Sequence, residues 1–260
     1  MTMLFQIKTY IKFVLKSSNH HGIHSPFVFD LVHNCFYDTS QKKWYKKLTN
    51  YINILLKNNT ELKIEDFGAG SKKLRQQKRK VSDIAKRAGI SKKRAQLLGR
   101  FVNYYKSENI LEIGTSLGIS TASMSLANSN SKIITLEGCK NTAEVGNNSF
   151  KNFNLQNIEQ IIGNFNDTLP KVLKNSTFDF IFFDGNHQKE PTIDYFKQCL
   201  NHCHNNSIFV FDDIYWSVGM KEAWNYIIEH PKVTVSIDTY YWGIIFFRKE
   251  QPKEHFTIRL

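Results

Sequence analysis

The pattern of apolar and polar positions changes near residue 107. Upstream of it, apolar side chains recur every three or four positions, which predicts helices over residues 1–60 and, broken at Gly89, over 81–106. Downstream, short β-rich runs alternate with stretches of helical spacing. The chain therefore begins with a helical part and continues as an α/β part.

The first helical stretch, residues 1–16, is amphipathic. Apolar residues such as Leu4, Ile7 and Ile11 repeat along one side, and lysines stand at positions 8, 12 and 16. This pattern fits a helix packed on the rest of the protein, and it also fits a helix lying on a membrane surface.

Five of the downstream runs are continuously apolar or nearly so. They are NILEI (109–113), KIITLE (132–137), NIEQII (157–162), FDFIFFD (178–184) and SIFVFD (207–212). Such runs are typical of a parallel sheet covered on both faces. Two further runs, 233–238 and 240–247, are separated only by Thr239 and indicate an antiparallel hairpin. We expect an α/β fold with a doubly wound, mostly parallel, seven-stranded sheet and an N-terminal helical extension.

Composition narrows the class of protein. The chain has 260 residues, 41% of them hydrophobic, so it is not a disordered or low-complexity sequence. Its apolar runs are too short to cross a bilayer, and its N-terminus lacks the features of a signal peptide. Four scattered cysteines then predict reduced thiols and a cytoplasmic location, without membrane insertion.

The net charge of +12 lies in one segment. Residues 72–106 hold 13 Lys or Arg and one acid, Asp83, while the rest of the chain is neutral. Such a patch suits an anionic partner, or it is a solvated helical face. Within it, residues 81–102 resemble a helix-turn-helix with Gly89 at the turn, so a nucleic-acid-binding regulator is an alternative to be tested.

The first strand opens into a glycine-bearing turn, in the spacing E-x-G-x-x-x-G. Glu112 starts it, Gly114 and Gly118 are its glycines, and Ser116 and Ser120 lie within or just after it. Glycines at such a turn let a ligand approach the backbone closely, although Gly118 also fits a helix-packing role. Glu137 ends the second strand, where an acid binds the two hydroxyls of a ribose.

Five segments in this order resemble a known family. ILEIGTSLGIST, ITLEG, GNFNDTLP, FDFIFFDGNH and FVFDD are similar to class I S-adenosylmethionine (SAM)-dependent methyltransferases, nearest to the metal-dependent O-methyltransferases of catechol, caffeoyl-CoA and macrolide-sugar type. The resemblance covers about residues 109–250. It implies two parts, a helical N-terminal cap over 1–106 and a SAM-binding Rossmann-like catalytic domain over 107–260.

The resemblance also implies where SAM binds. The methionine end would meet Glu112 and Gly114, with the Ser120 hydroxyl on its carboxylate, and the ribose would meet Glu137. The remaining expected contacts are the turn residues Ser116 and Gly118, Asn164 and Phe165 at the adenine, and Asp184 beside the sulfonium. Asn164 replaces an acid that is more common in the family.

Three carboxylates end neighbouring strands of the expected sheet. Asp184 ends one strand, and Asp212 and Asp213 end the next. Carboxylates that converge repel one another unless a hard cation lies between them, so we expect Mg²⁺ or a similar ion there. Asp213 agrees with the macrolide-sugar type and departs from the catechol type, and it also fits a helix cap. His187, three residues after Asp184, is the expected base, with a surface loop as its alternative role.

The resemblance and these residues predict a SAM-dependent methyltransferase that methylates a hydroxyl of a small molecule. We expect Mg²⁺ to assist the reaction. One alternative acceptor is RNA, held by the basic segment 72–106. The other alternative is the helix-turn-helix regulator. The acceptor's identity and the oligomeric state, with a homodimer among the options, stay open.

Overall fold

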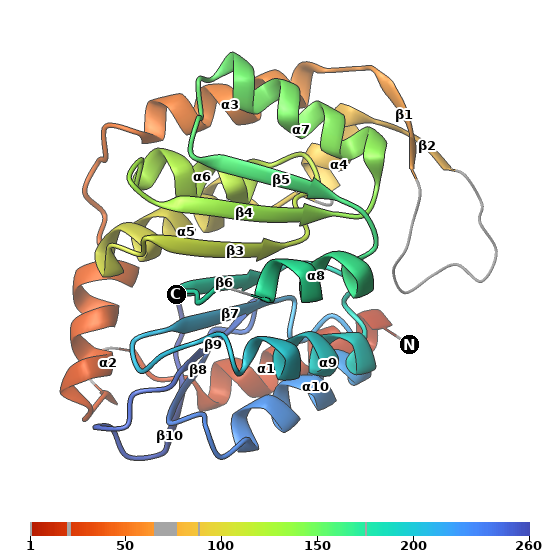
Figure 1. The fold of residues 1–260 in the computed structure, drawn as a ribbon. Coiled ribbons are helices and arrows are strands. Elements are labelled where there is room, and N and C mark those ends of the chain that lie inside the picture. The colour runs from red at the N-terminus through yellow and green to blue at the C-terminus, as the bar shows by residue number, and fades with distance from the viewer. Residues whose placement is uncertain (1, 20–21, 65–76, 88, 175) are drawn as a thin grey trace. The chain divides into compact units, whose positions relative to one another are not determined.

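A computed structural model gives the fold of the chain (Figure 1). It describes residues 2–19, 22–64, 77–87, 89–174 and 176–260. Two compact units form within it. Unit 1 comprises Met1–Tyr37 and Leu173–Leu260, and unit 2 comprises Asp38–Val172.

Unit 2 contains three parallel strands in the order β3-β4-β5. Their bounds are β3 (Asn109–Ile113), β4 (Lys132–Glu137) and β5 (Ile158–Ile162). The helices that follow them are α6 (Ile119–Ala127), α7 (Lys140–Asn152) and α8 (Phe165–Leu173). The register pairs Ile113 with Leu136 and Glu137 with Ile162, so the three strands end at one level. Polar residues that follow these ends therefore share one edge.

The helical part of unit 2 holds α3 (Tyr45–Lys57), α4 (Val81–Arg87) and α5 (Lys92–Tyr105). The break predicted at Gly89 separates α4 from α5. A face of α5 is buried against α6 and α3, and Gly99 lies so close to Trp44 and Ser123 that a Cβ would clash with both.

A two-stranded antiparallel ribbon, β1 (Glu61–Ile64) with β2 (Gln77–Lys80), precedes α4. The sequence analysis did not predict it: β1 alternates polar and apolar residues over only four positions, and β2 is polar throughout. The ribbon places Lys78, Arg79 and Lys80 of the basic segment on a strand rather than on a helix. Residues 72–76 of that segment lie outside the described residues.

Unit 1 contains five strands in the order β10-β8-β9-β7-β6. Their bounds are β6 (Phe180–Phe183), β7 (Ile208–Asp212), β8 (Val235–Asp238), β9 (Trp242–Phe246) and β10 (Glu254–Thr257). The helical segments are α1 (Thr2–Lys16), α2 (Pro26–Leu31), the π-helix η2 (Val32–Phe36), α9 (Lys189–Cys199) and α10 (Val218–Glu229). Every residue of β6 and β7 is buried, as their continuous apolar sequences require.

The predicted fold class is confirmed. Strands β3 to β9 are the seven expected strands, and β8 and β9 form the expected antiparallel hairpin. The pairs β3–β4, β4–β5 and β6–β7 are parallel, and β7 pairs with β9 in the antiparallel direction. Strand β10, which the sequence pattern did not predict, adds to β8 in parallel. The predicted division of the chain at residues 106 and 107 does not coincide with the two units and stays a prediction.

The hairpin turn is longer than predicted. Tyr240 and Tyr241 were placed in the second strand, but they lie in the turn with Thr239. The backbone of Tyr240 is left-handed, with φ of 72°, and its N–H donates to the Asp238 carboxylate at 2.8 Å. A single residue cannot reverse the chain, so the two tyrosines complete the turn and leave the ladder. None of the described helices combines the length and the apolarity that crossing a membrane requires.

Candidate functional site

The turn between β3 and α6 has a strained backbone. Gly114, Ser116 and Gly118 have φ of 107°, 49° and 77°. A Cβ on Gly118 would lie 2.4 Å from the Phe150 ring, so only glycine fits there. Left-handed residues gathered in one short loop are typical of ligand sites, where surrounding structure maintains the strain.

Glu112 lies fully buried beneath this turn. Its Oε2 accepts hydrogen bonds from the hydroxyls of Thr121 and of Thr135, the latter at 2.6 Å. Its Oε1 is buried without a hydrogen-bond partner among the described residues. Burial raises the pKa of Glu112 to about 7, while the hydroxyls, including that of Ser120, oppose the rise and Glu137 adds to it. A buried carboxylate oxygen that has no hydrogen-bond partner among the described residues is suited to accept a hydrogen bond from a cationic ligand.

Glu137, at the end of β4, ties the turn to the next helix. Its Oε2 accepts from the Ser116 N–H at 2.6 Å, and its Oε1 accepts from the Cys139 N–H at 2.8 Å and the Thr142 hydroxyl at 3.3 Å. Burial raises the pKa of Glu137, and these donors oppose the rise. The carboxylate is thus held rigidly at the edge where β3 and β4 end, with lone pairs left for further donors.

Asn164 and Phe165 follow β5 at the same edge. Asn164 is exposed, and its side-chain oxygen accepts from the Asn166 N–H at 2.9 Å, which opens α8. Phe165 is half-buried as the first residue of α8. The structure thus places the unit 2 members of the predicted SAM set at or directly beneath one strand edge, and their contacts with SAM stay predictions.

Three residues of this site were missed by the sequence reasoning. Thr121 and Thr135 hold Glu112, and Tyr51 of α3 donates to the Leu117 carbonyl at 2.9 Å and packs on the ring of Phe153. A threonine in a buried strand, paired in register with Glu112, is a signal that could have revealed Thr135. Tyr51 carries no such signal, because it lies on a helix 61 positions upstream of Glu112.

The unit 1 residues of the predicted site follow β6 and β7. These strands are parallel and pair Phe183 with Phe211, so Asp184 and Asp212 leave them at the same level. The His187 Nε2 lies 3.7 Å from the Asp184 Oδ1, and both side chains are partly exposed. Asn186 and Asp213 have left-handed backbones, with φ of 68° and 53°. Strain therefore marks the loops after β6 and β7, as it marks the turn after β3.

The predicted metal set is not assembled as a group. Among the residues that the structure describes, no three His, Cys, Asp or Glu side chains gather as a metal site. Asp184 faces His187, Asp212 is buried, and Asp213 lines a pocket described below. The arrangement as it stands does not fit a divalent cation, and the metal requirement stays a prediction.

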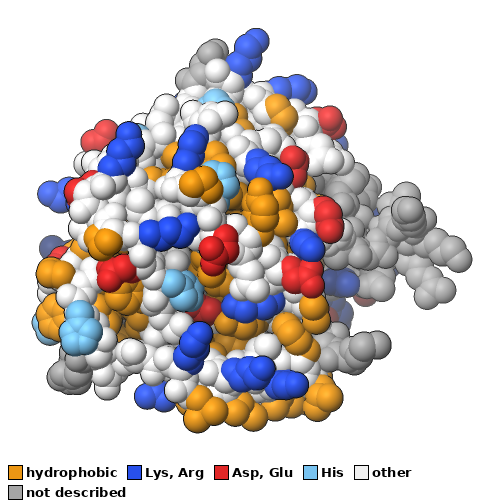
Figure 2. Space-filling view, turned by 90° about the horizontal axis from the view of Figure 1, so that it is seen from below, with side chains coloured by type: hydrophobic (Ala, Val, Ile, Leu, Met, Phe, Trp, Pro, Cys, Tyr) orange, Lys and Arg blue, Asp and Glu red, His pale blue; other side chains and the backbone are white. Residues whose placement is uncertain are grey.

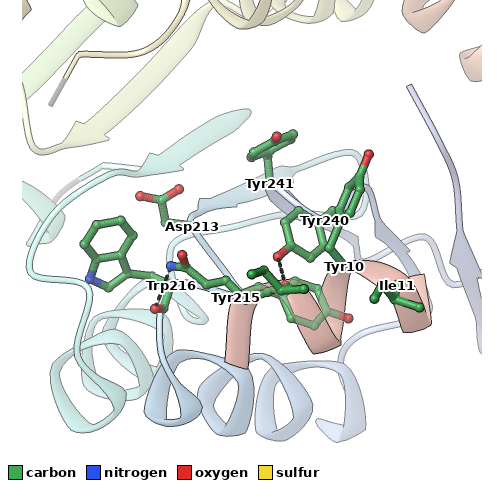
Figure 3. A pocket seen from close by; sticks show the side chains of 9 residues that line it. Tyr10, Ile11, Asp213, Tyr215, Trp216, Tyr240 and Tyr241 are labelled. Carbon is green, nitrogen blue, oxygen red and sulfur yellow. Dashed lines mark hydrogen bonds between the residues drawn. The ribbon is translucent and has the colours of Figure 1, made fainter. Parts of the chain in front are cut away.

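A pocket of about 420 Å³ lies in unit 1 (Figure 3). Its lining comes from α1, the loop after β7 and the β8–β9 turn. The residues are Gln6, Ile7, Tyr10, Ile11, Asp213, Tyr215, Trp216, Tyr240 and Tyr241. Tyr215 stacks on Tyr240 with centroids 4.8 Å apart, and Tyr10 meets Tyr240 edge-on at 5.0 Å. Tyr215 and Trp216, which follow the two aspartates, give the pocket aromatic side chains, whereas Met220 of α10 is buried in the core.

A buried polar network supports one wall of the pocket. The Tyr215 hydroxyl donates to the Asp238 carboxylate at 2.7 Å, and the Lys221 Nζ lies 3.0 Å from that hydroxyl. Burial raises the pKa of Tyr215 and lowers that of Lys221. The network fixes the ring of Tyr215, and through stacking it fixes Tyr240 as well.

Comparison with known proteins finds a matching family, a similar sequence and similar folds. Residues 111–214 match the family described as "Methyltransferase domain". A catechol O-methyltransferase of Niastella koreensis is 30% identical over 129 residues, which are 48% of this chain and 58% of that protein. The chain thus matches less than two thirds of that relative's length.

Solved structures share the fold. An O-methyltransferase from Bacillus cereus in complex with SAH has a TM-score of 0.56 at 17% identity, over 84% of this chain and 96% of that one. A SAH-bound methyltransferase from Podospora anserina has a TM-score of 0.61 at 15% identity, over 87% and 97%. The predicted resemblance to the class I SAM-dependent methyltransferases is confirmed by these matches, and the family match covers residues 111–214.

Proposed function

We propose that the chain is a methyltransferase that moves the methyl group of SAM to a hydroxyl oxygen of a small-molecule acceptor. The observation that carries the proposal is the turn after β3, where three residues of positive φ follow the buried Glu112, whose Oε1 has no hydrogen-bond partner among the described residues. The matched methyltransferase segment begins at this strand.

The donor would be held by unit 2. We assign the Glu112 Oε1, which is buried without a hydrogen-bond partner among the described residues, to the ammonium group of SAM, and the turn at Gly114 and Ser116 would let the backbone approach the ligand. Glu137 lies where the ribose hydroxyls would donate, and Phe165 offers a partly exposed ring to the adenine. These roles fit the observed burial and hydrogen bonding.

The acceptor would be held by unit 1. The volume of about 420 Å³ is within the range of small-molecule sites. Four tyrosines and Trp216 give apolar faces, and Asp213 gives one acceptor for a hydroxyl. The solved relative from Streptomyces achromogenes is described as an O-methyltransferase involved in tomaymycin synthesis, which agrees with a small-molecule acceptor.

Methyl transfer needs orientation and removal of one proton. SAM, when bound, supplies a methyl group on a sulfonium; the new O–C bond forms as the S–C bond breaks, and the sulfur keeps the electron pair. The acceptor's proton goes to a base, for which His187 is the candidate, with its Nε2 3.7 Å from the Asp184 Oδ1. Positioning supplies most of the acceleration in such a step.

No step is assigned to a cation, because Asp184, Asp212 and Asp213 do not gather as a metal site among the described residues. Whether the enzyme uses one is tested by assaying activity after EDTA treatment and after adding back Mg²⁺. Loss and recovery would show that the three carboxylates rearrange around an ion, and unchanged activity would remove the metal from the proposal.

The proposal is tested by calorimetry with SAH and by a methyl-transfer assay on phenolic and sugar hydroxyls. We expect SAH to bind, and we expect Glu137→Ala to weaken that binding while the exposed control Glu159→Ala does not. Absence of SAH binding to the folded wild-type protein would refute the function. The cytoplasmic location stays a prediction, consistent with four cysteines that are all free thiols.

A further inference from the structure

Helix α1 of unit 1 turns an apolar face outward. It is anchored by its opposite side: Phe13 is buried and packs on Tyr240, whose hydroxyl donates to the Gln6 carbonyl at 2.8 Å. In contrast, Leu4 is 76% exposed and Leu15 is 82% exposed. A helix of a globular protein normally buries its apolar stripe, so this orientation needs an explanation.

The exposed stripe belongs to a larger patch. Of the fifteen large hydrophobic residues exposed in the described part of the chain, nine lie on α1 or on the segments around the pocket. They are Met3, Leu4, Ile7, Tyr10, Ile11, Leu15, Trp216, Val218 and Tyr241. Five of them also line the pocket, so patch and pocket are continuous. Concentration of exposed apolar residues in one place marks an interaction surface.

The charged side chains of α1 are all positive, and one acid, Asp213, lies in the pocket lining beside the stripe. Lys8, Lys12 and Lys16 are exposed, and four-residue spacing aligns them in a row next to the apolar residues. No acidic residue occurs in α1. Burial lowers the pKa of Lys221 and of His255, and the charge of Lys16 adds to both shifts while Asp238 opposes them. Figure 2 shows hydrophobic side chains gathered along one edge of the face it views, with Lys and Arg side chains beside them.

We propose that α1 docks on the surface of an anionic lipid membrane, lying in the plane of the interface. Lipid acyl chains would take the apolar stripe, and the headgroups would neutralise the lysine row. Trp216, Tyr10 and Tyr241 at the pocket fit the headgroup level, where aromatic residues with a polar end are favoured.

A second copy of the chain is the less suitable occupant. Two copies of this face would bring two rows of lysines together without an acid on either helix to compensate them. An anionic membrane satisfies both the apolar and the basic part of the surface. The docking does not depend on methyl transfer, and it is measured without donor or acceptor.

The test is co-sedimentation of the full chain with lipid vesicles, either of phosphatidylcholine alone or with 30 mol% phosphatidylglycerol. We expect binding to the anionic vesicles and at least tenfold weaker binding to the neutral ones. Leu4→Ser with Leu15→Ser should reduce anionic binding about tenfold or more, since each removes an apolar side chain from the interface. Lys8→Gln with Lys12→Gln should weaken it and reduce its dependence on salt.

The matched control is Ile54→Ser with Leu56→Ser, two exposed apolar residues on α3 of unit 2. This control should bind vesicles like the wild type. Circular dichroism and SAH binding are measured on each variant, so that misfolding is recognised. Equal binding by the Leu4/Leu15 variant and the wild type, or no vesicle binding at all, would overturn the proposal. A wild-type dimer that the Leu4/Leu15 variant dissociates, without vesicle binding, would assign the face to a second copy instead.

Discussion

The buried Glu112 should make both the stability of the protein and its affinity for the donor depend on pH. The substitution Glu112→Gln tests this, because it should change the two quantities in opposite directions. The substitution keeps the shape of the side chain and its contacts with Thr121 and Thr135, but it removes the ionisable group. In the ligand-free protein the carboxylate is fully buried and one of its oxygens has no partner among the described residues. A charge there is opposed by desolvation and by Glu137.

The magnitude follows from the pKa of Glu112, which burial raises from its ordinary 4.5 to about 7. This rise corresponds to about 3 kcal/mol against the charged form. Because the pKa is higher in the folded state, the group favours folding fully below pH 4.5, and this contribution is lost as the pH rises to about 7. At pH 8 we therefore expect ligand-free Glu112→Gln to be more stable than the wild type, by up to about 3 kcal/mol.

Donor binding should change in the opposite direction. If the ionised Glu112 accepts from the ammonium of SAM, its loss removes a hydrogen bond between charged groups, of about 1.5–3 kcal/mol. SAH affinity at pH 8 should then fall about 10- to 100-fold in Glu112→Gln. Wild-type affinity should itself weaken below pH 7, as the carboxylate is protonated, whereas that of the variant should not follow this titration.

The assays are urea unfolding and SAH calorimetry at pH 5, 6.5 and 8, with Glu159→Gln as a control on an exposed acid of β5. A variant that binds SAH as tightly as the wild type at pH 8 would refute the role of Glu112 at the ammonium. A wild-type stability that is unchanged relative to the variant across this pH range would refute the raised pKa.

Three further predictions test other parts of the site. Gly118→Ala should destabilise the protein by about 1–3 kcal/mol and abolish SAH binding, because its Cβ would meet the Phe150 ring at 2.4 Å; thermal melting and calorimetry measure this, and a normal melt would contradict it. His187→Ala should lower kcat about 10²- to 10⁴-fold with the KM for SAM unchanged, and a kcat within threefold of the wild type would remove His187 as the base. Neutralising the basic end of the β1–β2 ribbon should raise the KM of an anionic acceptor without changing SAM affinity, and equal KM values would leave the ribbon as a solvated face. The substitutions for that test are Lys78→Gln, Arg79→Gln and Lys80→Gln.

The strands could be predicted from the sequence because each is a local property. The run 109–113 is β3 and the run 132–137 is β4, residue for residue, since a buried parallel strand is rich in apolar and β-branched residues and is followed by turn residues. The β1–β2 ribbon and β10 carry no such pattern. These segments form strands because each pairs with a partner strand, and the local sequence does not indicate that pairing.

The candidate site likewise contains residues that the local sequence predicts and residues that only the tertiary structure brings in. Glu112 and Glu137 were predictable because each stands at a fixed position relative to a strand end, and the parallel register then aligns those ends. The pocket was only partly predictable. Tyr215 and Trp216 follow a strand, whereas Gln6 and Tyr10 come from a helix more than 200 residues away along the chain, and only tertiary packing brings them together.

The metal prediction depends on side-chain directions, which the positions of the strand ends do not determine. Two neighbouring parallel strands do bring Asp184 and Asp212 to the same level, as expected. A shared level fixes the Cα positions and not the direction of the side chains. The left-handed backbone at Asp213 and the interaction of Asp184 with His187 are set by the loops beyond the strands. The EDTA experiment therefore tests whether these loops can bring the three carboxylates onto one ion, which the strand pattern leaves undetermined.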